Sequence, residues 1–131
     1  MLDRATVLIE SNVFDANRHS IASTGRPGSG YEAANNLVLE HATSHVFDMH
    51  GGRDRKDGTQ IAGDWMKIHH NTVRAAHVPA LVIRGIPQDK VEVHHNWFLA
   101  PDPKTLRGLV QPTDYLSVSR NLFGADAKLV E

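Results

Sequence analysis

The 131-residue sequence contains no cysteine, which excludes disulfide bonds and thiolate metal sites. It has no apolar stretch long enough to span a bilayer, no run of basic residues and no recognisable signal peptide. The net charge is −1 and the pI about 6.7, so charge gives no reason to expect binding to nucleic acid or to a membrane. A chain of this length is expected to form one domain, residues 1–131.

A short pattern recurs along the chain. Residues 66–73 read MKIHHNTV and residues 91–98 read VEVHHNWF, and related stretches occupy residues 7–14, 31–38 and 116–123. Each copy places apolar residues at its first, third and last positions and an asparagine at its sixth. The shared asparagines are Asn12, Asn36, Asn71, Asn96 and Asn121, at intervals of 24, 35, 25 and 25 residues. Self-similarity at such a period indicates a solenoid.

The alternation of apolar and polar residues at the start of each copy is typical of a short strand with one buried face. A single strand of this length cannot bury that face alone, whereas parallel stacking of successive copies buries a continuous core. Stacked strands lie roughly 4.8 Å apart, so the five asparagines are expected to form a ladder of hydrogen-bonded amides. A Leu-rich repeat is not favoured, because the leucine consensus that it requires is absent.

This combination resembles the right-handed parallel β-helix of the pectin-lyase-like superfamily, which also carries an asparagine ladder. The resemblance covers roughly residues 5 to 125 and implies an all-β, right-handed parallel β-helix of about five coils. That superfamily includes polysaccharide lyases, glycoside hydrolases, uronate epimerases, phage tailspikes and non-enzymatic surface proteins. The resemblance therefore implies a polysaccharide partner and a secreted or cell-surface location.

A second strand is expected in each of the first three coils, ending at Gly25, Gly51 and Gly85. Two insertions interrupt the period. Residues 52–63 form a polar, glycine-bounded loop whose Arg and Lys side chains are expected to be solvated, and residues 100–112 form a proline-containing irregular excursion. Because a solenoid exposes its ends, we also expect a longer chain or a homo-oligomer to cover them. The expected inward columns are Ile21/Phe47/Leu81 and Ser23/Met49/Ile83, and the outward columns include Ala22/Asp48/Val82 and Thr24/His50/Arg84.

Asp48, His50 and Arg84 are the predicted catalytic residues, because stacking of the second strands places all three on one outward face. A carboxylate, an imidazole and a guanidinium on one patch could bind an acidic sugar and move a proton. The alternative is an ordinary surface salt-bridge network. The predicted substrate-binding residues are Arg26, Arg53, His19 and Trp65, the last as a platform for a sugar ring.

Nine histidines are the one compositional excess of the chain. His45, Asp48 and His50 form a candidate site for a divalent metal ion, Ca²⁺ or Zn²⁺, and His19 aligns with His45 and could complete a zinc-type site. His69 and His94 share one outward column, and His70 and His95 share the position before the asparagine. These four could bind a metal, or could repeat only because the coil repeats.

Two functions remain in competition. In polysaccharide lyases of this fold, the resemblance implies a base, often Arg or Lys, that removes the C5 proton of a uronate. A cation or Arg neutralises the uronate carboxylate, and β-elimination follows. The sequence lacks the clustered calcium aspartates and the Arg-x-x-Pro-x-x-Arg motif of pectate lyases, and it lacks the paired carboxylates of glycoside hydrolases. We therefore expect a lyase-like protein acting on acidic polysaccharide. The alternative is a non-catalytic carbohydrate-binding or structural segment of a larger surface or secreted protein.

Overall fold

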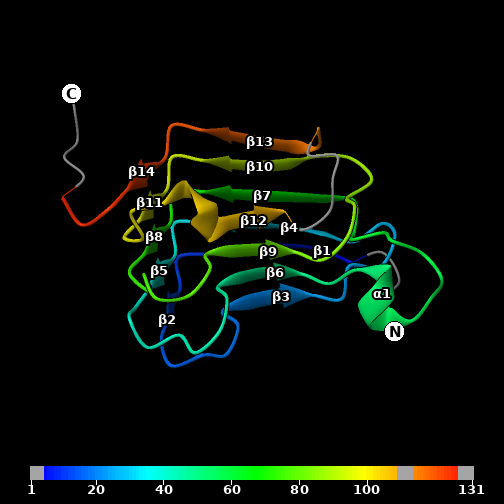
Figure 1. Ribbon diagram of the computed structural model, residues 1–131, viewed down its shortest axis with the longest axis horizontal. Coiled ribbons are helices and arrows are strands. Elements are labelled where there is room, and N and C mark those ends of the chain that lie inside the picture. The colour runs from blue at the N-terminus through cyan, green and yellow to red at the C-terminus, as the bar shows by residue number, and fades with distance from the viewer. Residues whose placement is uncertain (1–4, 109–113, 127–131) are drawn as a thin grey trace.

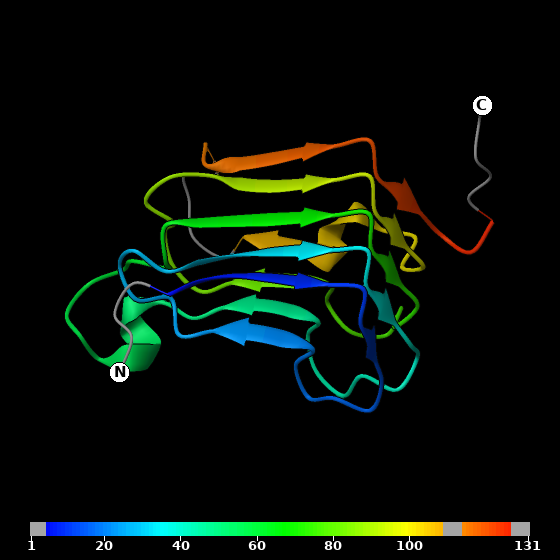
Figure 2. The ribbon, with the colours of Figure 1, turned by 180° about the vertical axis from the view of Figure 1, so that it is seen from behind.

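The computed structural model describes residues 5–108 and 114–126, and shows an all-β parallel solenoid of about four turns (Figure 1). The chain runs along one wall, turns through a short strand, and returns along the opposite wall, rising by one strand spacing per coil (Figures 1 and 2). The path is right-handed, as expected for parallel strands joined by crossovers.

Three parallel sheets form the walls. Sheet A stacks β1 (Thr6–Glu10), β4 (Gly30–Ala34), β7 (Trp65–His69), β10 (Val91–His94) and β13 (Leu116–Ser119). Sheet B, at the turn, stacks β2 (Val13–Phe14), β5 (Leu37–Val38), β8 (Thr72–Val73), β11 (Trp97–Phe98) and β14 (Leu122–Phe123). Sheet C, on the opposite wall from sheet A, stacks β3 (Ile21–Ser23), β6 (Phe47–Met49), β9 (Leu81–Ile83) and β12 (Leu106–Gly108).

The core fills the space between the walls, and the predicted register of sheet C is confirmed. Ile21, Phe47 and Leu81 pair in one column, and Met49 and Ile83 pair in the next. These five side chains are at most 5% exposed. The three central strands of sheet A contribute alternate residues to the core, with Tyr31, Ala33, Met66, Ile68, Val91 and Val93 buried.

The asparagine ladder runs through the whole stack. The Nδ2 of each asparagine donates to the Oδ1 of the next, at 3.2, 3.0, 3.0 and 2.9 Å from Asn12 to Asn121. The same Oδ1 atoms accept the backbone N–H of the preceding asparagine at 3.0 Å. The Nδ2 of Asn71 also donates to the carbonyl of Ala33 in the previous coil. The amides of Asn36, Asn71 and Asn96 therefore each join three coils. The residue before each of the five asparagines takes a left-handed backbone conformation (φ 53–57°) to make the turn.

The two insertions differ from expectation in their local structure. The loop at residues 52–63 begins with a single helical turn, α1 (Gly52–Arg55). The excursion at residues 100–112 was predicted to be irregular, but it contains a 3₁₀ turn (Pro103–Thr105) followed by β12, which pairs with β9 as the edge strand of sheet C. Pro101 and Pro103 precede β12, so neither proline removes a backbone donor from the ladder of this strand. Residues 109–112 of this insertion lie outside the described part of the chain.

We expect Asn71→Ala to lower the free energy of unfolding by about 2–5 kcal/mol, because the backbone and side-chain donors of Asn36 lose a buried acceptor. Asn12→Ala is the matched control: Asn12 is exposed at the first coil, and its loss should cost less than about 1 kcal/mol. Urea denaturation of both variants measures the difference. Equal losses would show that the ladder does not stabilise the central coils.

Candidate functional site

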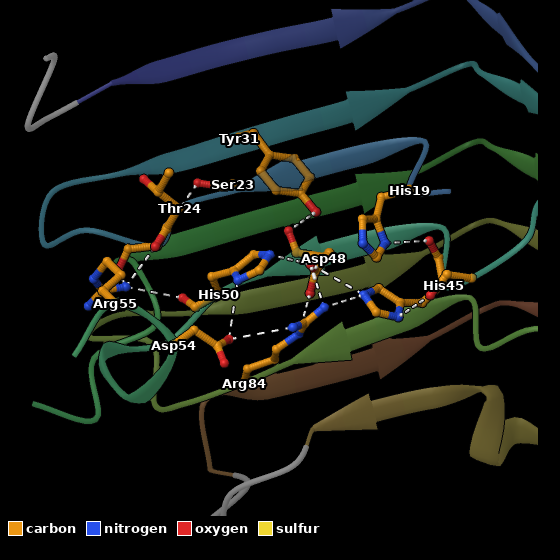
Figure 3. A network of polar contacts seen from close by, with 12 residues as sticks. His19, Ser23, Thr24, Tyr31, His45, Asp48, His50, Asp54, Arg55 and Arg84 are labelled. Carbon is orange, nitrogen blue, oxygen red and sulfur yellow. Dashed lines mark hydrogen bonds and ion pairs between the residues drawn. The ribbon is translucent and has the colours of Figure 1, made fainter. Parts of the chain in front are cut away.

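The side chain of Asp48 is the centre of a polar network on the outer face of sheet C (Figure 3). It projects from the middle of β6, as the outward register predicts, with Ala22 and Val82 beside it in the neighbouring coils. Its carboxylate is nevertheless fully buried, because His45, His50 and Arg84 close over it. A buried carboxylate needs such partners, since an unpaired charge of this kind is strongly destabilising.

Arg84 reaches back from the end of β9 to bind this carboxylate with two hydrogen bonds. Its Nε donates to Oδ1 at 3.1 Å and its Nη2 donates to Oδ2 at 3.0 Å. The same Nη2 lies 2.7 Å from Nε2 of His45. A guanidinium can only donate, so Nε2 of His45 must accept and the ring proton must lie on Nδ1, which faces the Ser44 hydroxyl at 3.2 Å. Burial lowers the pKa of His45, which favours this neutral form, although the Asp48 carboxylate opposes the shift.

His50 lies between two carboxylates. Its Nε2 is 2.9 Å from Oδ2 of Asp48, and its Nδ1 is 3.2 Å from Oδ2 of Asp54 on α1. The buried Asp48 carboxylate can accept a hydrogen bond from Nε2–H of His50. In the neutral ring with this tautomer, the lone pair lies on Nδ1. Asp54 also makes a long ion pair with Nη1 of Arg84, at 3.6 Å. One carboxylate therefore orients the imidazole, and the other faces the nitrogen that can take a proton.

A hollow of about 230 Å³ opens beside His50 on the side of the first coil. Ala22 contributes only a methyl group to the outer face of β3, so no long side chain fills the surface there. The hollow is lined by His50 and by Asp54, whose carboxylate contacts Nδ1 of His50, and a ligand there would lie beside both side chains. The remaining lining residues are Ser23, Thr24 and Arg55.

Arg55 holds α1 in place, so the expectation that the cations of this loop are solvated is wrong for this residue, whereas Arg53 and Lys56 are exposed as expected. Its Nη1 donates to the carbonyls of Thr24 and Gly25, both at 2.7 Å, and to that of His50 at 3.3 Å. Its Nη2 donates to the carbonyl of Ile61 at 2.8 Å. The side chain is only 12% exposed. One guanidinium thus joins the first coil, the end of β6 and the far side of the loop.

The predicted substrate-binding residues do not all gather at this site. His19 does, because its ring stacks on that of His45 with centroids 4.1 Å apart. Arg53 lies on α1 and is exposed, next to Asp54 in the sequence. Trp65 lies on the outer face of sheet A, across Gly30, and so on the wall opposite the Asp48 network. Arg26 is partly buried in the turn that leads into β4.

Three participants were not predicted from the sequence as site residues. Asp54 and Arg55 lie within the insertion, where no repeat aligns them with another coil. Tyr31 lies in the core, and its hydroxyl also donates to the backbone carbonyl of Asp48 at 3.3 Å. Burial raises the pKa of Tyr31, so the hydroxyl stays a donor beneath the site.

The four histidines of sheet A form a separate group. His69 stacks on His94 and His70 on His95, each with ring centroids 5.0 Å apart. Within each coil the two Nδ1 atoms face each other at 2.8 Å. His69 also binds Glu32 through Nε2, at 2.7 Å. The nitrogens of a pair thus bond to each other, and this group offers no shared centre for a metal ion.

Comparison with protein-family models, curated proteins and solved structures finds no match to this chain. The likeness of this chain to β-helix proteins therefore rests on its fold, the parallel solenoid with its asparagine ladder. No helix within residues 5–108 and 114–126 has the length and hydrophobicity needed to cross a membrane.

We expect Arg55→Met to release the loop at residues 52–63, because four carbonyl groups lose their donor. Limited proteolysis under native conditions should then cut within this loop much faster than in the unmodified protein. Arg53→Met, on the same helical turn but exposed, is the matched control and should leave the cleavage rate unchanged. Similar cleavage of both variants would contradict the anchoring role of Arg55.

Proposed function

We propose that the outer face of sheet C binds an acidic polysaccharide and that His50 acts there as the base of a β-elimination. The observation that carries this proposal is the position of His50, whose Nε2 is held by a fully buried carboxylate while its ring lines an open hollow. A buried carboxylate behind an imidazole fixes the tautomer and stabilises the imidazolium that forms on proton uptake. Asp48 is the positioning residue for this base.

In the proposed reaction, Nδ1 of His50 removes the C5 proton of a uronate residue. The electron pair of the C5–H bond forms the C4–C5 double bond as the C4–O4 bond breaks, and the leaving oxygen takes a proton from water or from the imidazolium. Asp54, which now faces Nδ1, would have to turn towards solvent to admit the sugar, and its side chain is 36% exposed. Nη1 of Arg84 makes only the long contact to Asp54, and can bind the uronate carboxylate whose neutralisation acidifies the C5 proton.

The rest of sheet C supports an anionic polymer as the ligand. Arg107 lies in β12 in the same outward column as Asp48, with Val82 between them. It is exposed, and with Lys104 it borders a second hollow of about 290 Å³. Cations in successive coils of one wall, Arg84 after β9 and Arg107 in β12, suit a chain that lies along the solenoid axis and carries repeated carboxylates.

A second candidate is a non-catalytic polysaccharide-binding module. The observation that favours it is the pairing of Arg84 with Asp48, which satisfies both charges without a ligand. Such a module would bind the same polymers along sheet C and release no product. The two candidates therefore differ in turnover and not in the surface used.

We expect an unsaturated, ultraviolet-absorbing product when the protein is incubated with a panel of uronate polymers. His50→Gln should lower the initial rate by about 10²–10⁴-fold, because the base is lost. His94→Gln, on the opposite wall, should retain the rate. No product with any polymer, while binding persists, would favour the non-catalytic module. An unchanged rate in His50→Gln would exclude His50 as the base.

A further inference from the structure

We propose that His19, His45 and Asp48 form a binding site for a zinc-type divalent transition-metal ion, with Arg84 as a competing resident cation. Each of the three residues offers one donor atom, and these atoms lie within 4.8 Å of one another. This is the one such trio found within the described part of the chain. Neutral imidazole and carboxylate are suitable ligands for zinc-type ions, and a site with three protein ligands keeps a position open. The inference does not depend on the proposed lyase activity.

The orientation of both imidazoles supports the site. A metal-ligating histidine usually donates its other ring N–H to a nearby oxygen, which fixes the ligand nitrogen. Nδ1 of His45 faces the Ser44 hydroxyl at 3.2 Å, and Nδ1 of His19 faces the carbonyl of His45 at 3.4 Å. Both rings are therefore held from behind through Nδ1, which leaves Nε2 of each as the ligand atom.

The distances between donors suit a tetrahedral ion. Nε2 of His45 lies 3.3 Å from Oδ2 of Asp48. Two ligands of a tetrahedral ion with bonds of about 2.0–2.1 Å are about 3.3 Å apart. The sequence predicted His50, and not His19, as the third ligand beside His45 and Asp48. Nε2 of His50, however, lies only 2.9 Å from Oδ2 of Asp48. That contact is a hydrogen bond to the carboxylate, so His50 orients a ligand and His19 completes the trio.

Arg84 occupies the position that an ion would take. Its Nη2 is 2.7 Å from Nε2 of His45 and 3.0 Å from Oδ2 of Asp48, the same two atoms that would bind the metal. A metal ion can enter only when this end of the guanidinium turns away, for which the partly exposed side chain has room (26% exposed). The arginine thus compensates the buried carboxylate when the metal is absent and lowers the apparent metal affinity when it is present.

Zinc binding to the full chain, measured by calorimetry and by metal analysis after dialysis, tests this proposal. We expect one tightly bound ion per chain. His19→Gln and His45→Gln should each weaken binding by more than about 100-fold, beyond the loss typical of an outer-shell partner. Substitution with Co²⁺ should give the strong visible absorption of a tetrahedral site.

Arg84→Met should tighten zinc binding by about tenfold or more, because the competing cation is gone. Zinc should also raise the melting temperature of this variant more than that of the unmodified protein, since the ion replaces the lost charge partner of Asp48. If the Arg84→Met variant does not fold without metal, its refolding on addition of zinc would support the proposal. Failure of zinc to restore folding would contradict the proposed competition between zinc and Arg84 for His45 and Asp48.

The His69→Gln, His94→Gln double variant is the control for adventitious binding by the stacked histidines of sheet A, and it should bind zinc as the unmodified protein does. Loss of binding in this control, with full binding in His45→Gln, would overturn the proposal. The absence of measurable zinc binding in both the unmodified protein and Arg84→Met would overturn it as well.

Discussion

The asparagine ladder fixes the register of each coil on the next, that is, which residues lie side by side on neighbouring strands. The Asp48 site depends on that register. Each of the three central ladder amides bonds to the coil before it and to the coil after it, as Asn71 does with Ala33 and Asn96. Displacing one coil along the wall by a single residue would break these bonds and expose the core face of every strand in that coil. Because the register is set in the buried turn, residues of sheet C up to 39 positions apart in sequence, such as His45 and Arg84, become neighbours on one wall.

Burial of Asp48 imposes a second constraint, which the surrounding residues satisfy. The carboxylate lies on an outward column, where solvent would normally reach it, and yet it is fully covered. Its two oxygens accept three hydrogen bonds from Arg84 and His50. Removal of water strengthens these bonds and also raises the penalty for any missing partner. The network therefore holds the Asp48 carboxylate and the rings of His45 and His50 in defined orientations.

The fold and the composition of the patch could be predicted from the sequence because both follow from the period. The asparagine spacing gives the register of the coils, and the terminal glycines of the second strands place Asp48, His50 and Arg84 on one face. Burial of Asp48 could not be predicted, because it depends on how long side chains fold back over the wall. Asp54 and Arg55 were missed for a different reason: they lie in an insertion, where the repeat gives no register and the contacts are set by one local helical turn.

The two groups of histidines show why composition alone does not identify a site. On sheet A, the Nδ1 atoms of His69 and His70 face each other, so one nitrogen of each ring is occupied by a hydrogen bond to the other ring. On sheet C, Nδ1 of His45 faces a hydroxyl and Nδ1 of His19 faces a carbonyl, while Nε2 of His45 faces the Arg84 guanidinium, so the ring of His45 does not bond to that of His19. The first arrangement follows from repetition of the coil, since the same pair recurs 25 residues later. The second arrangement gathers residues from coils that differ in sequence around one buried carboxylate. Repetition of the coil therefore does not explain it.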